Sequence, residues 1–161
     1  MAAGTNDADE VLMRQALALA DRAEQEFDEI PVGAIVVDAG GVVIGEGWNR
    51  NISDHDPSAH AEIMAMRQAG RALGNHRLIG CSLYVTLEPC AMCAMAMVHA
   101  RVARLVYAAP DPKTGAAGGV FDLVEDPRHN HRIAVVRGVL AAEAGTRLTN
   151  YFRRKRGKPP L

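Results

Sequence analysis

The sequence has few cysteines, no long apolar run and almost no net charge. Each of these features limits the kinds of protein that it can encode. Its 161 residues include only three cysteines, and this small odd number argues against the disulfide framework of a secreted protein. No stretch of about 18 apolar residues occurs, so we expect no membrane-spanning helix. The segment "MAAGTNDADE" at the N-terminus is acidic and lacks the apolar core of a signal peptide. Together these features favour a reducing, cytoplasmic compartment.

The length and composition are those of one globular domain. Hydrophobic residues make up 48% of the chain and charged residues 23%, which is close to the average for globular proteins. A chain of this size can bury a core without disulfides. We find no internal repeat, low-complexity segment or linker that would divide it. We therefore expect residues 1–161 to form a single domain.

The net charge of −1 conceals a strong asymmetry between the two ends. Residues 1–29 carry eight acidic residues and two arginines, whereas residues 147–161 carry six cationic residues and no acidic one. Such an asymmetry predicts a basic C-terminal helix or tail, from about residue 147, that meets an anionic partner. The alternative is a solvated helix end whose cations interact favourably with the helix dipole.

Hydrophobic periodicity and turn residues predict four helices and five strands. The helices are expected at 8–27, 59–73, 90–100 and 140–156, and the strands at 32–37, 42–48, 82–88, 103–109 and 132–138. The first two strands form a hairpin, and the others alternate with helices, which implies parallel pairing with helices on both faces of the sheet. The predicted fold class is therefore α/β, with a mixed five-stranded sheet.

Two cysteines in "TLEPCAMC" are the first candidates for chemistry. Pro89 favours an extended Glu88 and so ends the preceding strand, and its fixed φ starts the turn into the next helix. Cys90 and Cys93 are one helical turn apart, so both sulfurs can reach one ion. The helix N-terminus also favours the thiolate form that binds metals.

His60 is the best candidate for a third ligand. It lies at the start of a predicted helix, after "DHDPS", where Asp56 or Ser58 could cap the helix. In α/β folds, successive crossovers bring helix N-termini to the edge where the parallel strands end, so His60 can meet Cys90 there. Three protein ligands leave one zinc position for water, which is the pattern of a catalytic site.

Glu62 is the candidate proton carrier beside this site. Side chains two positions apart point about 200° away from each other within a helix. The geometry is looser at a helix start, so the Glu62 carboxylate could lean over the metal rather than bind it. Zinc lowers the pKa of bound water from about 15.7 to about 7, and the carboxylate would take the released proton.

Two other interpretations of the cysteine pair were weighed. A thioredoxin-type redox pair can follow a strand, but it leaves "HAE" at 60–62 unexplained. A structural zinc site needs a fourth ligand, and Cys81 lies about 23 Å away across an extended strand. "HAE" followed by "PCxxC" is, in this order, the established signature of zinc nucleobase deaminases.

The matching motifs extend well beyond the metal site. They include "PVGAIVV", "GEGWNR", "HDPSAHAEIMAMRQ", "LYVTLEPCAMC", "KTGAAG" and "YFRRKR". Over roughly residues 11–156 the sequence resembles the bacterial tRNA-specific adenosine deaminases of the cytidine deaminase superfamily. The resemblance implies a three-layer α/β/α, cytidine deaminase-like domain that forms a homodimer. It also implies that adenosine becomes inosine at the wobble position of a tRNA anticodon stem-loop.

The resemblance also implies roles for individual residues. His60, Cys90 and Cys93 would hold Zn²⁺, and Glu62 would carry the proton from water to the purine ring and then to the leaving ammonia. Asn49 would hydrogen-bond the flipped nucleotide. On sequence alone, Asn49 could equally be a turn residue after a strand.

Further RNA contacts are expected from two segments. Tyr151 and Phe152 would stack on bases, and the adjacent Arg153 and Arg154 would contact phosphates. The alternative is that Phe152 packs in the core while the arginines are merely solvated.

In "DPKTGAAG", Lys113 would touch phosphate and Asp111 a ribose or flanking base, while the glycines would let the backbone approach RNA. The alternative is an ordinary flexible loop. One departure from the family is Met95, where a glycine is usual, which puts close helix packing at that position in doubt.

Two rival functions remain open. A deaminase of a free nucleobase, such as guanine or cytosine, would use the same metal site without needing the basic C-terminal helix. A zinc-stabilised binding module would keep its function without the Glu62 carboxylate.

Overall fold

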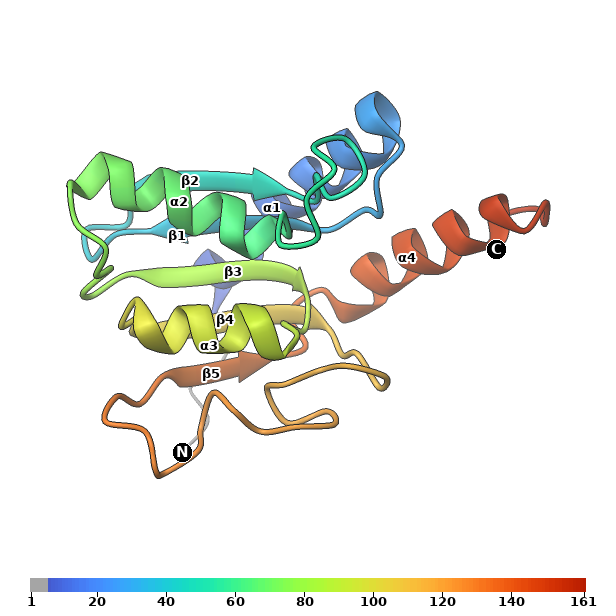
Figure 1. The fold of residues 1–161 in the computed structure, drawn as a ribbon. Helices are drawn as coiled ribbons and strands as arrows, with labels where there is room; N and C mark the ends of the chain where they lie inside the picture. Colours follow the sequence, from blue (N-terminus) through green and yellow to red (C-terminus); the bar gives the residue numbers. More distant parts are fainter. Residues whose placement is uncertain (1–5) are drawn as a thin grey trace.

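The computed structural model describes residues 6–161, and residues 1–5 of the predicted domain lie outside this range. The described residues form four helices and five strands (Figure 1). In chain order these are α1 (Asp7–Phe27), β1 (Gly33–Val37), β2 (Val43–Trp48), α2 (Ala61–Leu73), β3 (Ser82–Leu87), α3 (Ala91–His99), β4 (Arg104–Ala109), β5 (Ala134–Arg137) and α4 (Ala141–Lys155). The predicted elements are confirmed, with boundaries shifted by one or two residues.

The strands form one mixed sheet in the order β2-β1-β3-β4-β5. The opening hairpin makes β1 antiparallel to β2, and β1 is also antiparallel to β3. The crossovers through α3 and the following loop make β3, β4 and β5 parallel. This arrangement confirms the mixed five-stranded sheet that the sequence predicts.

Helices cover both faces of the sheet, so the domain has three layers (Figure 1). α2 and α3 cover one face, where Ala61, Ala65, Cys93 and Met97 belong to the first buried cluster. α1 and α4 cover the other face, and their residues belong to the second buried cluster. The charge-free sequence of α3 fits its position over the centre of the sheet.

Close packing of α2 on β2 depends on two glycines. A Cβ atom at Gly47 would lie 2.6 Å from the Ala65 nitrogen, and a Cβ at Gly45 would lie 3.0 Å from the Ala69 nitrogen. Real Cβ atoms essentially never lie within 3.0 Å of such atoms, and a Cβ at Gly45 would lie closer still to the Ala65 carbonyl oxygen. The "GEGW" motif therefore fixes the distance of α2 from the sheet.

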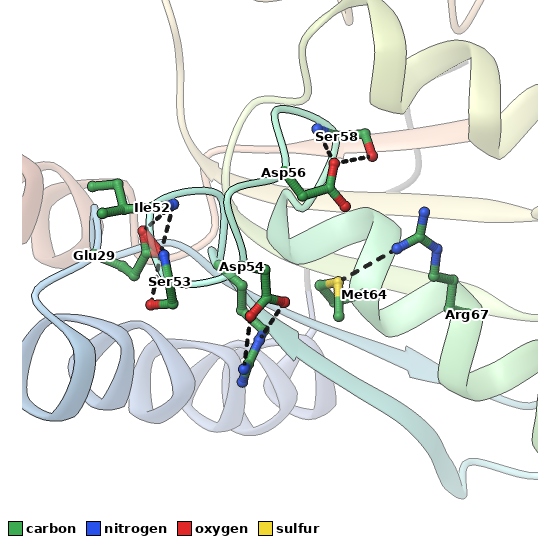
Figure 2. Close-up of polar contacts among 9 residues, drawn as sticks. Glu29, Ile52, Ser53, Asp54, Asp56, Ser58, Met64 and Arg67 are labelled. Carbon is green, nitrogen blue, oxygen red and sulfur yellow. Dashed lines mark hydrogen bonds and ion pairs between the residues drawn. The ribbon is translucent and has the colours of Figure 1, made fainter.

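The N-terminus of α2 differs from the sequence expectation. The helix begins at Ala61, and His60 occupies the cap position with an extended backbone, φ −73° and ψ 156°. The predicted caps were wrong, because Asp56 instead accepts hydrogen bonds from the backbone and hydroxyl of Ser58 (Figure 2). The Ala61 N–H donates to Asn49 Oδ1 at 2.9 Å, so Asn49 provides the missing cap from the end of β2.

A buried ion pair ties α1 to the sheet. The Asp9 carboxylate accepts hydrogen bonds from Arg104 at 2.6 and 2.7 Å and from the Tyr84 hydroxyl at 2.7 Å. Burial alone would raise the pKa of Asp9, but the hydrogen bonds from Arg104 and Tyr84 and the charge of Arg104 bring it below its usual range. Asp9 is therefore ionised in the folded protein at neutral pH.

Within the described residues, no helix combines the length and apolar character needed to cross a bilayer.

Candidate metal centre and substrate cavity

The three predicted ligands meet at one edge of the sheet. His60 precedes the first turn of α2, Cys90 precedes that of α3, and Cys93 lies within the first turn of α3. His60 Nδ1 lies 3.6 Å from Cys90 Sγ and 3.5 Å from Cys93 Sγ. All three ligand atoms lie within 4.8 Å of one another, and no fourth candidate ligand from residues 6–161 joins the cluster. The convergence inferred from the strand order is therefore present in the structure.

This donor set fits zinc. Tetrahedral Zn–N and Zn–S bonds of about 2.0 and 2.3 Å place the nitrogen and sulfur atoms about 3.5 Å apart. The observed separations agree with this value. Imidazole and thiolate are also the ligands that zinc prefers.

The protonation of Cys90 suits a metal ligand. Hydrogen bonds from Cys93 and His60 lower the pKa of the Cys90 thiol to about 4, so the thiolate predominates at neutral pH. The hydrogen bond to Cys90, together with burial, raises the pKa of Cys93. A divalent cation between the two sulfurs would relieve the repulsion that opposes a second thiolate.

Cys81 takes no part in this cluster. It is buried just before β3, whereas Cys90 follows the other end of that strand. Its exclusion from the ligand set was predicted from the strand length.

Glu62 lines the same cavity as His60 and Cys90. His60 has extended backbone angles rather than helical ones, so the mid-helix angle between positions two apart does not apply. Only 4% of Glu62 is exposed, and this burial raises the pKa of its carboxyl to about 7. Such a group can both accept and release a proton near neutral pH.

Asn49 lies in the cavity wall and is almost fully buried. Its Oδ1 accepts from the Ala61 N–H, so its amide NH₂ must point away from the start of α2. Within residues 6–161, Nδ2 has no hydrogen-bond partner. It is also not one of the unpartnered atoms that are fully buried, so it keeps some exposed surface. Asn49 thus combines the turn role with a free donor that a substrate can reach.

The cavity has a volume of about 720 Å³. His60, Glu62, Cys90 and Asn49 lie on its wall together with apolar side chains from the segment before β1, from β3 and from α4. Four cationic residues also line it: Lys113, Arg153, Arg156 and Lys158. The site therefore combines a metal-binding cluster with a cationic rim.

A buried carboxylate supports the loop that carries Asn51 into this cavity. Glu29, which is fully buried, accepts hydrogen bonds from the backbone of Ile52 and Ser53 and from the Ser53 hydroxyl. Figure 2 shows these three residues together, beside the loop that precedes α2. Sequence reasoning did not identify Glu29, because nothing in its local pattern indicates this partner.

The aromatic and basic residues of α4 fall on two faces. Phe152 and Arg153 line the cavity, and 40% of Phe152 is exposed. Tyr151 is buried, and Arg154 forms ion pairs with Glu24 and Asp28 of the α1 end. The cavity therefore gives no support to the RNA-contact predictions for Tyr151 and Arg154, which stay untested. Tyr151, rather than Phe152, is therefore the aromatic residue of this pair that is buried.

The loop after β4 is ordered by hydrogen bonds within it, and its RNA contacts stay a prediction. Lys113 and Asp111 line the cavity, but the Asp111 carboxylate accepts from the backbone of Lys113 and from both the backbone and hydroxyl of Thr114. A Cβ atom at Gly119 would lie 2.7 Å from Glu88 Oε1. Gly119, which follows the motif, therefore makes room for Glu88, and the approach of the motif's glycines to RNA stays a prediction.

Comparisons with known proteins agree with this site. Residues 6–109 match the family described as the cytidine and deoxycytidylate deaminase zinc-binding region. The chain is 51% identical over 148 residues to the tRNA-specific adenosine deaminase of Haemophilus influenzae, covering 92% of this chain and 85% of that protein.

Two solved structures extend the comparison. A chain from a study of A-to-I editing by tRNA:A34 deaminases at the wobble position is 43% identical, with a TM-score of 0.80, covering 86% of this chain and 99% of that one. A guanine deaminase from Nitrosomonas europaea is 29% identical, with a TM-score of 0.75, covering 94% of this chain and 85% of that one. The ligand cluster, the fold and these relatives together show that the chain belongs to the zinc-binding cytidine and deoxycytidylate deaminase family, on the branch of the bacterial tRNA-specific adenosine deaminases.

Proposed function

We propose that this protein is a zinc-dependent hydrolase that converts adenosine to inosine at the wobble position of a tRNA anticodon. The observation that carries this proposal is the combination in one cavity of His60, Cys90 and Glu62 with a cationic rim. The metal cluster supports hydrolytic deamination, and the rim supports a polyanionic substrate. The tRNA specificity of the Haemophilus influenzae relative favours the same substrate.

His60, Cys90 and Cys93 would hold Zn²⁺, which supplies Lewis-acid activation of water in deaminases of this kind. The chain's own contribution to the chemistry centres on Glu62. Its carboxylate takes a proton from water and delivers it to the purine ring. It then transfers the second proton to the departing amino group, so adenosine and water become inosine and ammonia. A pKa of about 7 suits a group that must do both.

Asn49 would hold the target nucleotide through the free NH₂ of its side chain. Because the Ala61 N–H fixes the amide orientation, this donor is set before the substrate arrives. The same hydrogen bond connects Asn49 to the helix that carries Glu62.

The half-buried metal cluster lies on the cavity wall, so the target base would have to leave its stack to reach it. Anticodon loops are single-stranded, so their bases can be splayed into a pocket at low cost. Lys113, Arg153, Arg156 and Lys158, which line the cavity, would contact flanking phosphates, and Phe152 would stack on a neighbouring base.

A second candidate is the deamination of a free nucleobase such as guanine. The Nitrosomonas europaea guanine deaminase shares the fold at 29% identity, and it favours this alternative. Such an enzyme would need the metal cluster but not the cationic rim. Removing residues 153–161 should therefore cripple a tRNA deaminase and spare a free-base deaminase.

The test is to incubate the zinc-loaded protein with an anticodon stem-loop bearing wobble adenosine and to measure inosine. Free adenosine, adenine, guanine and cytosine are assayed in parallel. We expect inosine from the stem-loop only. Turnover of a free base together with an inert stem-loop would favour the second candidate.

We further propose that residues 1–161 act as a single domain that forms a homodimer in the cytoplasm, where its tRNA substrate would be found. The outer groove between α2 and α3 supports the dimer, because apolar side chains such as Ile63, Met66 and Ala96 line it. Met95, in place of the usual glycine, is half-buried and packs against the buried cluster on the same face of the sheet.

Sedimentation velocity tests the dimer. We expect the wild-type protein to sediment as a dimer and the Ala96→Arg variant as a monomer. Gln25→Arg on α1, across the sheet from this groove, serves as the control, and a monomeric wild type would contradict the proposal.

A further inference from the structure

Glu88 is a buried carboxylate to which the chemistry above assigns no role. It follows the last residue of β3, lies two residues before Cys90 and is 2% exposed. Among the described residues no cation pairs with it. Its oxygens instead accept backbone N–H groups from Asp111 at 3.0 Å, Ala117 at 3.0 Å and Gly119 at 2.8 Å. Three charge-assisted hydrogen bonds replace the water that this charge loses on burial.

The segment 110–119 is built around this carboxylate. A Cβ atom at Gly119 would lie 2.7 and 2.8 Å from the two Glu88 oxygens, so the backbone can approach Glu88 only where a side chain is missing. Next to Glu88, the Pro89 carbonyl accepts the Ala116 N–H at 2.8 Å. The turn that leads into Cys90 therefore holds this segment at several points.

The same segment forms one wall of the substrate cavity through residues 110–114, including Lys113. Asp111 belongs to both features, since its N–H binds Glu88 while its carboxylate orders Lys113 and Thr114. A shift of the segment would move Lys113 relative to the metal ligands. These contacts thus fix the position of the wall relative to the metal-binding turn.

From these contacts we infer that Glu88 is a positioning residue, which couples the metal-binding turn to the wall that receives the nucleotides flanking the reacting base. This inference rests on the proposed function for the identity of the substrate. Glu88 also lines the cavity, but its two carboxylate oxygens accept three backbone N–H groups, so we assign it an action through the segment 110–119 rather than on the reacting atoms.

Glu88→Gln is the first test, because glutamine keeps the shape but replaces one acceptor oxygen by an NH₂ donor. At least one backbone N–H would then face another donor instead of an acceptor. The cavity wall formed by residues 110–114 would be held less firmly. We expect KM for the stem-loop to rise roughly 10-fold or more, with kcat changed less than about threefold and zinc content unchanged. Amide exchange at Asp111, Ala117 and Gly119 should accelerate by about 10-fold.

Asp38→Asn is the matched control. Asp38 also accepts two backbone N–H groups, from Gly40 and Val42, but in the β1–β2 turn at the opposite end of the strands. We expect this variant to keep the wild-type KM and the wild-type exchange rates in residues 110–119.

Gly119→Ala tests the same coupling without changing the carboxylate, and it carries the test should the glutamine variant not fold. Its Cβ atom would push the segment away from Glu88. We expect the same rise in KM, and the effects of the two substitutions together should be smaller than their sum, because they disturb one contact.

Two results would overturn the inference: a fall in kcat and zinc content with an unchanged KM, or unchanged amide exchange in Glu88→Gln. Failure of the proposed function has a different signature, namely a wild-type protein that is inert on the stem-loop. In that case KM is measured for the free base that the protein does deaminate. The amide-exchange measurement needs no substrate and is carried out unchanged.

Discussion

Single residues decide the chemistry of this site through the backbone positions that they occupy. His60 lies just outside α2 and Glu62 just inside it, so the two side chains face one cavity although they are two positions apart. Asn49 completes the arrangement by capping the same helix from β2. The proposed acid-base group, the first metal ligand and the proposed substrate donor therefore lie together at the N-terminus of α2.

Glu62→Gln should leave the metal in place and abolish turnover. Glutamine keeps the size of the side chain but cannot carry a proton, so we expect kcat to fall by about 10²- to 10⁴-fold. Inosine formation under saturating stem-loop gives kcat, and elemental analysis gives the zinc content per chain. Retained wild-type rates in this variant would refute the role of Glu62, and a wild-type protein that binds the stem-loop without forming inosine would indicate a binding module.

Asp9→Asn should destabilise the protein at neutral pH by about 2–3 kcal/mol, because it leaves the Arg104 guanidinium facing a neutral amide. The pKa of Asp9 is lowered on folding, so this contribution is complete above its unfolded-state pKa of about 3.9. It is lost as the pH falls through the lower folded-state value. Urea unfolding of both proteins between about pH 2 and pH 7 measures the difference.

The two unfolding curves should converge toward the acidic end of this range. A constant difference at every pH would show that the Asp9 charge does not stabilise the fold. Asp7→Asn, in the same helical turn, is the control for the general effect of removing an acidic residue near the start of α1.

At the scale of elements, α4 directs neighbouring arginines to two different places, the cavity and the end of α1. "YFRRKR" contains two arginines in a row, and successive helical positions point about 100° apart. Arg153 consequently lines the cavity, whereas Arg154 pairs with the acidic end of α1. The two oppositely charged ends of the chain thus partly neutralise each other within the fold.

Arg153→Ala and Arg154→Ala form a matched pair for this separation. Arg153→Ala should raise KM for the stem-loop and reduce the slope of log affinity against log salt by about 0.7, the value for one lost phosphate contact on a single strand. Arg154→Ala should leave KM within about twofold, because its partners are the acidic residues of α1. Binding isotherms over a range of salt concentrations measure both effects, and equal losses for the two variants would contradict the assignment.

At the scale of the whole molecule, the metal cluster joins parts of the chain that the sequence keeps apart. His60 and Cys90 are 30 positions apart and precede different helices, and only the sheet brings them to within 3.6 Å. A bound ion therefore links α2 to α3 at the edge of the sheet. Its binding energy contributes to the stability of the fold.

Removing the metal should lower the melting temperature and abolish deamination, and added zinc should restore both. A metal present at about 100 times its dissociation constant stabilises the folded state by about 2.7 kcal/mol. Calorimetry with and without a chelator measures this contribution. Cys90→Ser is the control, since it should show little chelator-dependent shift, and a chelated protein that melts and reacts like the untreated one would contradict the zinc site.

Sequence patterns predicted the sheet, the helices and the metal ligands because their signals are local or fixed by chain topology. Apolar periodicity marks each element, and crossover connections dictate that His60 and Cys90 face the same sheet edge. The helix cap was predicted wrongly, because Asn49 lies 12 positions from Ala61 and no local pattern pairs them.

The sequence by itself determined the kind of chemistry, since the ligand types and their spacing allow few other sites. Only the tertiary structure decided which polar groups serve the cavity. Glu29 and Glu88 support its surrounding loops, Tyr151 is buried and Arg154 is paired with α1. The physical reason is that Glu29, Glu88 and Arg154 each satisfy their charge against a partner more than 20 positions away, and a linear pattern records the residue but not the partner.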